Sequence, residues 1–158
     1  MSNDKSNINE FEEIMCNSLE LIDQKSLIFH LLYASDSYEY DASLESIADN
    51  FSRGFGYTIN TNDWVFKVTQ NIINNKEEID QKILPLLSNW RFDRLGTVTR
   101  LILRLGIWQL ANLEQDVAVI INDSIELAKC FAEKDAHKFI NGVLDEFAKR
   151  NNLKNSIV

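Results

Sequence analysis

Residues that break helices are scarce in this sequence, and this scarcity limits the folds open to the chain more than any other feature. Its 158 residues include one proline, Pro85, and five glycines. An all-β sandwich or barrel needs a turn about every 8–12 residues, and Gly and Pro supply most such turns. The sequence therefore disfavours a turn-rich β fold and favours a helical one.

Apolar residues recur with helical spacing in one segment after another. In DAHKFINGVLDEF (135–147) they fall at i, i+3, i+4, i+7, i+8 and i+11, which is one face of an α-helix. We expect an all-α protein of two packed three-helix bundles, with six or seven helices in total. Comparable spacing predicts helices over about 23–36, 44–51, 65–73, 79–87, 97–110 and 117–131.

The segment TVTRLILRLGIWQL (97–110) is apolar around most of its helical circumference. A helix of this kind is buried on nearly all sides, so we expect it to be the central one. Arg104 interrupts the apolar run, and we expect it to pair with a carboxylate or a helix carbonyl between the two subdomains.

The helix predicted after Asp135 opens with polar residues that its apolar face does not explain. Asp135 stands at the N-cap position, where its side chain could accept from the free N–H groups of the first turn. Gly142 lies in the middle of this helix, where Gly costs about 1 kcal/mol relative to Ala. We expect that the missing side chain lets another helix approach closely. Phe139 falls on the apolar face and suits the core, whereas His137 projects away from that face.

The charge of the chain is uneven. The formal net charge is −8, which argues against a generic nucleic-acid-binding protein, since such proteins display a basic field. Residues 1–90 hold 6 basic and 15 acidic side chains, whereas residues 91–158 hold 10 and 9. A phosphate contact is therefore expected in the second half.

No apolar run approaches the ~20 residues of a membrane span, and the polar N-terminus does not resemble a signal peptide. We therefore expect a cytoplasmic protein. Cys16 and Cys130 are far apart, without metal-ligand spacing, and we expect free thiols. No motif for catalysis or cofactor binding is present, so we expect a non-enzyme without cofactors.

We expect the chain to consist of an extension (1–20), one domain (21–152) with parts 21–75 and 76–152, and a tail (153–158).

Two stretches of the second half resemble the NusB family of bacterial transcription antitermination factors. They are NWRFDRLGTVTRLILRLGIWQL (89–110) and SIELAKCFAEKDAHKFINGVLDEFAK (124–149), of which AEKDAHKFINGVLD is the most specific. The resemblance is weaker before residue 89, where LLY (31–33) is among the few matches.

The resemblance implies a protein that binds the boxA element of ribosomal RNA leaders together with NusE, a small-subunit ribosomal protein. The pair would act on RNA polymerase alongside other Nus factors, and the protein would be a monomer or a homodimer. The RNA positions it implies are Asp135, His137, Lys138 and Phe139, at the start of the last helix. An exposed helix N-terminus attracts phosphate, and an aromatic ring can stack on an unpaired base.

The family's second RNA-binding element, an arginine-rich stretch before LLY, is largely missing here. The matching residues read LIDQKSLIFHLLY (21–33), in which Lys25 is the basic residue and Asp23 is acidic. Each lost phosphate contact lowers affinity for RNA. An alternative function is therefore a protein–protein adaptor that keeps a NusE-like partner and binds RNA weakly or not at all by itself.

The remaining expected site residues are one phosphate contact and three partner contacts. Arg100 is the better phosphate candidate among the arginines of the second half, because Arg104 is assigned a structural role. Tyr33, Asp93 and Thr99 match family positions near the NusE contact, although Thr99 stands where a carboxylate is common. An acidic face would suit a basic ribosomal protein.

Overall fold

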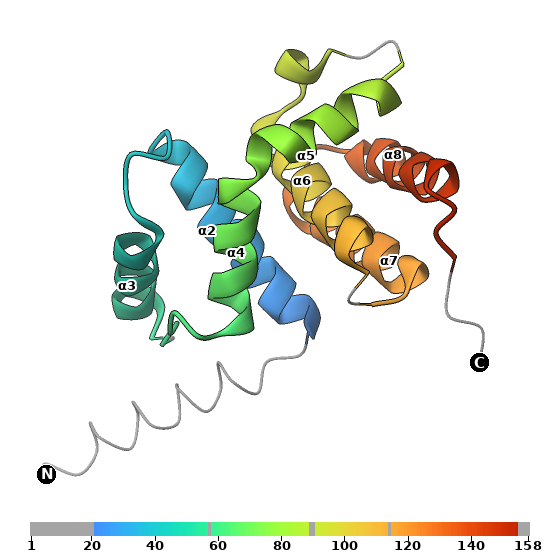
Figure 1. Ribbon diagram of the computed structural model, residues 1–158. Coiled ribbons are helices and arrows are strands. Elements are labelled where there is room, and N and C mark those ends of the chain that lie inside the picture. Colours follow the sequence, from blue (N-terminus) through green and yellow to red (C-terminus); the bar gives the residue numbers. More distant parts are fainter. Residues whose placement is uncertain (1–20, 57, 89–90, 114, 155–158) are drawn as a thin grey trace, which may run out of the picture. The chain divides into compact units, whose positions relative to one another are not determined.

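The computed structural model of the protein describes residues 21–56, 58–88, 91–113 and 115–154 (Figure 1). Every regular element within these ranges is a helix, which confirms the predicted all-α class. The extension 1–20, with Cys16, and residues 155–158 of the predicted tail lie outside the described residues. The elements are α2 (Leu21–Ser37), α3 (Leu44–Phe55), α4 (Trp64–Asn74), α5 (Lys76–Ile83), η1 (Leu84–Leu86), η2 (Phe92–Arg94), α6 (Thr97–Asn112), α7 (Val117–Phe131) and α8 (Ala136–Arg150).

The chain separates into two compact units, with the division between Asn71 and Ile72. The division expected at residues 75 and 76 stays a prediction. In the first unit α2 packs against α3. Helix α3 begins where Ser43 Oγ accepts a hydrogen bond from Ser46 N at 3.2 Å, and it ends at Gly56, whose φ of 72° is left-handed.

Helix α6 is the centre of the second unit, as its apolar circumference predicts. It contacts α5, α7 and α8 (Figure 1). Nine of its residues are buried, including Leu103 and Ile107, which are fully inaccessible. Helix α8 turns Ile140, Val143 and Leu144 inward, so the predicted apolar face of 135–147 is confirmed over most of its length.

The glycine that permits close helix approach is Gly106 of α6, and the expectation for Gly142 was wrong. A Cβ at Gly106 would lie 2.9 Å from both Cδ atoms of Leu144 on α8 and 3.1 Å from Ser124 Oγ on α7. Gly142 is exposed, and a Cβ there would meet nothing within 4 Å. It borders an open hollow and does not pack closely against a neighbouring helix, a difference that periodicity alone does not reveal.

Arg104 joins α6 to α5 through a bidentate ion pair. Its Nε lies 2.7 Å from Asp80 Oδ1, and its Nη2 lies 2.8 Å from Asp80 Oδ2. The two side chains are only 10% and 18% exposed. The expected carboxylate partner is thus confirmed, but it lies within the second unit, because both helices belong to that unit.

Replacing Gly142 and Gly106 by alanine should change the stability of the protein in opposite directions. Gly142→Ala should stabilise the protein by about 1 kcal/mol, because Ala favours helix and meets open space. Gly106→Ala gains the same propensity, but it forces extra volume against the fully buried Leu144, which typically costs about 1–3 kcal/mol. Urea unfolding should therefore place Gly106→Ala below wild type in stability. Equal gains for both variants would contradict the close approach at Gly106.

The Arg104–Asp80 pair predicts a large loss of stability when one partner is removed. Arg104→Met leaves Asp80 charged and largely buried, and such a change costs about 3–5 kcal/mol. The matched control is Arg91→Met, whose partner Asp93 lies at 2.9 Å with both side chains about two-thirds exposed. Pairs of that kind contribute about 0–1 kcal/mol. Similar unfolding midpoints for the two variants would refute the structural role of Arg104.

Candidate nucleic-acid interface

The start of α8 lacks the side-chain cap that the sequence predicts. Asp135 does occupy the N-cap position, but its backbone is left-handed, with φ 68° and ψ 0°, and its side chain makes no capping hydrogen bond. Capping aspartates normally adopt an extended backbone, which aims the carboxylate at the first-turn N–H groups. Here the carboxylate lies beside Lys138, with Nζ 3.5 Å from Oδ1. No side chain caps the first turn, but two of its N–H groups already have backbone acceptors. Ala136 N–H donates to the Glu133 carbonyl and Lys138 N–H to the Asp135 carbonyl, each at 3.1 Å.

Lys138 is the exposed cation of this helix start. Its side chain is 73% exposed, and that of Asp135 is 58% exposed. An ion pair this open contributes about 0–1 kcal/mol, so a phosphate could replace Asp135 at little cost. His137, next to Lys138, is half-buried.

Phe139 lies between core and solvent. It is half-buried, whereas Ile140 beside it is completely buried. Phe139 lines a hollow of about 520 Å³, in which buried Leu87 and Val143 supply apolar surface. Exposed Gly142 lines the same hollow. A flat ring beside an open, partly apolar space is suited to stacking on an unpaired base.

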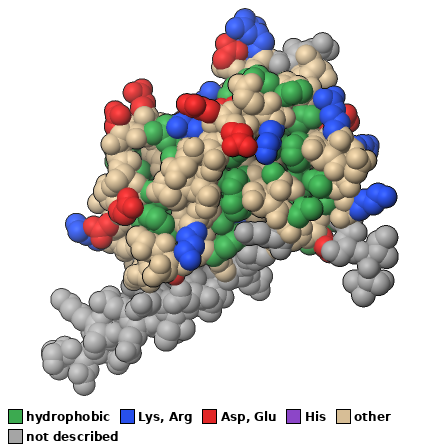
Figure 2. Space-filling model, in the orientation of Figure 1, with side chains coloured by type: hydrophobic (Ala, Val, Ile, Leu, Met, Phe, Trp, Pro, Cys, Tyr) green, Lys and Arg blue, Asp and Glu red, His purple; other side chains and the backbone are tan. Residues whose placement is uncertain are grey.

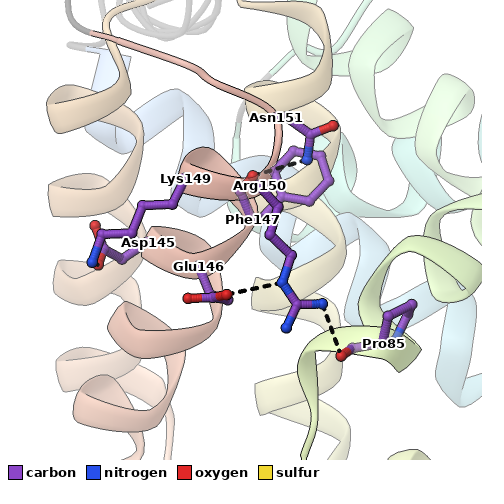
Figure 3. A network of polar contacts seen from close by, with 7 residues as sticks. All are labelled: Pro85, Asp145, Glu146, Phe147, Lys149, Arg150 and Asn151. Carbon is purple, nitrogen blue, oxygen red and sulfur yellow. Dashed lines mark hydrogen bonds and ion pairs between the residues drawn. The ribbon is translucent and has the colours of Figure 1, made fainter.

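Arg150 completes the lining of this hollow at the far end of α8. Its Nε donates to Glu146 Oε1 at 2.8 Å, and its Nη1 donates to the Pro85 carbonyl at 3.2 Å (Figure 3). Sequence reasoning missed this residue. The i, i+4 spacing of Glu146 and Arg150 does suggest a pair on the helix. The contact with Pro85 spans 65 residues and has no local signal in the sequence.

The other expected phosphate contacts are less available. Arg100 Nη2 donates to Thr97 Oγ1 at 3.3 Å, and its guanidinium lies 6.0 Å from the centre of the Phe92 ring. Arg100 is thus half-buried near the start of α6. Lys25 of α2 has no exposed surface at all. Lys25 is therefore not part of the exposed surface that RNA could contact.

The three expected partner positions are all accessible to some degree. Tyr33 of α2 is 46% exposed and lies in the first unit. In the second unit, Asp93 of η2 is exposed and paired with Arg91 at 2.9 Å. Thr99 is half-buried in the first turn of α6.

Most cations of the second unit already have acidic neighbours. Lys149 pairs with Asp145 at 3.0 Å, and this hydrogen bond and the carboxylate charge raise the pKa of Lys149. Lys129 has a similar partner in Glu126 at 3.7 Å. On the face seen in Figure 2, basic and acidic side chains are interspersed. Where such a pair forms, the carboxylate offsets the positive charge of the basic side chain beside it.

Comparison with known proteins decides the family. The model of the NusB family matches residues 23–149, which is most of the chain. The chain belongs to the NusB family. Among the curated members, NusB of Sulfurovum sp. (strain NBC37-1) is 36% identical over 115 residues, which cover 71% of this chain and 88% of that protein.

Another NusB-family relative aligns mainly over part of its length. NusB of Helicobacter hepaticus is 43% identical over 88 residues, covering 55% of this chain and 56% of that protein. The chain thus spans little more than half of this curated relative. No helix in the described ranges is long and apolar enough to cross a membrane.

Solved structures of NusB share the fold of the chain. T. maritima NusB superposes with a TM-score of 0.70 and 27% identity, covering 83% of this chain and 92% of that one. A crystal structure of the antitermination factors NusB and NusE in complex with double-stranded RNA also gives a TM-score of 0.70 at 27% identity. That match covers 82% of this chain and 96% of the other.

Proposed function

We propose that this NusB-family chain is a transcription antitermination factor that binds boxA-type RNA of ribosomal RNA leaders together with a NusE-like ribosomal protein. The observation that carries the proposal is the start of α8, where an exposed lysine and a half-buried phenylalanine come together at the positive end of the helix dipole. This start lies inside the segment that matches the family. The similar structure that holds NusB, NusE and RNA supports the same pairing of partners.

The proposed RNA contacts divide by chemistry. Lys138 binds phosphate, since its side chain is exposed and the positive end of the α8 dipole favours an anion there. Phe139 stacks on an unpaired base, a contact that contributes about 1–3 kcal/mol. His137 lies beside these groups. When phosphate binds, it replaces Asp135 as the partner of Lys138. Arg100 adds a peripheral phosphate contact.

The proposed protein contact involves Tyr33, Asp93 and Thr99 and a partner that is basic. The net charge of −8 complements such a ribosomal protein. Complementary charge raises the rate of encounter more than it tightens the final complex. RNA polymerase and the other Nus factors would then be reached indirectly, through the assembled complex.

A second candidate function is an adaptor that keeps the NusE-like partner and binds RNA weakly or not at all without it. Burial of Lys25 favours this candidate, because α2 then exposes no Lys or Arg side chain before LLY. Asp23, by contrast, is exposed there. Most basic side chains of the second unit form ion pairs, and this also favours the adaptor, since a paired cation releases fewer counterions from RNA.

One titration separates the two candidates. A boxA-type RNA oligonucleotide is titrated with the protein alone and with the protein bound to its NusE-like partner, each at low and at moderate salt. The leading proposal predicts binding that is tighter with the partner and that weakens as salt rises. Tight, salt-sensitive binding by the protein alone would reject the adaptor. Absence of binding even with the partner would reject the leading proposal.

Charge reversal at the start of α8 tests the assigned site. Lys138→Glu should weaken RNA binding by the complex by about tenfold or more, because it removes one phosphate contact and adds repulsion. Lys134→Glu is the matched control, since Lys134 is exposed in the loop just before α8 and changes net charge equally. Fluorescence anisotropy of labelled RNA measures both. Equal losses would show that only overall charge matters and would refute the site.

A further inference from the structure

Two hollows lie along the side of α8 that meets η1, and the RNA contacts proposed above use only one end of this surface. The first hollow, of about 520 Å³, runs from Lys138 to Arg150. The second, of about 450 Å³, is lined by Arg150, Leu153 and Lys82 among others. Leu86 and Arg150 line both hollows. We call the two together the α8–η1 groove.

We infer that an RNA strand bound at Lys138 continues along the α8–η1 groove, places one unpaired base beside Gly142 and contacts Arg150 with a later phosphate. This inference rests on the proposed function and extends its site by about 18 Å, the length of the helix from residue 138 to residue 150. Stacked bases repeat about every 3.4 Å along one strand, so the span accommodates a few nucleotides.

The lining of the first hollow fits a base. Leu87 and Val143 are buried and apolar, whereas Ser88 and Glu146 offer polar groups at the same hollow. Space is available because residue 142 is glycine, where an added Cβ would meet nothing. Binding sites for small flat ligands combine apolar walls with a few polar groups in this way. The mid-helix glycine, which weakens the helix, is thereby given a role in binding.

The guanidinium of Arg150 is held in position to meet a phosphate. Arg150 Nε donates to Glu146 and Nη1 donates to the Pro85 carbonyl (Figure 3). Among the described residues, Nη2 has no hydrogen-bond acceptor. The side chain is about half exposed, so solvent and ligand reach it. A guanidinium that is already oriented loses less entropy when it binds phosphate. Glu146 thus orients Arg150, but its negative charge also weakens attraction of the strand.

Lys149, the residue before Arg150 in the same helix, provides a matched control. It pairs with Asp145 at i, i+4, as Arg150 pairs with Glu146, and it carries the same charge. In Figure 3 the Lys149–Asp145 pair lies on a different side of α8 from the Arg150–Pro85 contact. Lys149 lines neither hollow. Any effect of net charge alone must therefore be equal for the two residues.

The experiment measures the salt dependence of binding of a boxA-type RNA oligonucleotide to the complex with the NusE-like partner. Arg150→Gln should make the negative slope of log K against log salt shallower by about 0.7 and weaken low-salt binding by about threefold to tenfold, as loss of one phosphate contact requires. Lys149→Gln should leave the slope unchanged. Equal effects of the two variants would overturn the inference.

Two further variants test the base and the role of Glu146. Gly142→Leu fills the hollow without altering charge, so affinity should fall while the salt slope stays the same. Glu146→Gln keeps an oxygen that can accept from Arg150 and removes the negative charge, so affinity should rise. A fall for Glu146→Gln, or no change for Gly142→Leu, would refute the groove. Thermal unfolding of each variant checks that it is folded.

The outcomes also separate the inference from the function it extends. If the wild-type complex fails to bind the RNA, the proposed function fails. If the wild type binds and Lys138→Glu weakens it, but Arg150→Gln behaves like Lys149→Gln, the function stands and the groove inference fails.

Discussion

The close approach of α6, α7 and α8 at Gly106 is the contact on which the rest of the second unit depends. Without a side chain at Gly106, Leu144 and Ser124 reach the α6 backbone, and this sets the side of α8 that faces the core. Ile140 and Leu144 are then fully buried. The same rotation leaves Lys138 and Gly142 exposed. The packing of three helices at one glycine thus determines which residues of α8 can meet a ligand.

Much of this arrangement could be predicted from sequence, and the errors have physical causes. Periodicity predicted the helices and the central position of α6, because burial on all sides requires an apolar residue at nearly every position. It could not tell Gly106 from Gly142, since both lie in apolar helices and only the neighbouring helices distinguish them. The capping role of Asp135 was wrong, because a left-handed backbone is not encoded in residue type alone. Arg150 was missed because its contact with Pro85 is distant in sequence.

The electrostatics of the described residues support the proposed dependence of RNA binding on a partner protein. Most basic side chains of the second unit lie near carboxylates, and Lys25 in the first unit is buried. In the proposed complex, a paired cation must leave its carboxylate before it binds phosphate. The contact therefore contributes less binding free energy than a contact made by an unpaired cation. Apolar and stacking contacts near Phe139 then carry a larger share of the affinity. A second protein that contributes its own cations would supply the missing electrostatic part.

In the proposed complex, RNA binds at the start of α8 and on the surface beside it. The most direct test is a backbone amide NMR titration of the complex with a boxA-type RNA oligonucleotide. Binding at this surface should give the largest chemical-shift changes at the first turn of α8, at Gly142 and at residues 86–88. Changes confined to α3 and α4, or to the outer surface of α7, would contradict it.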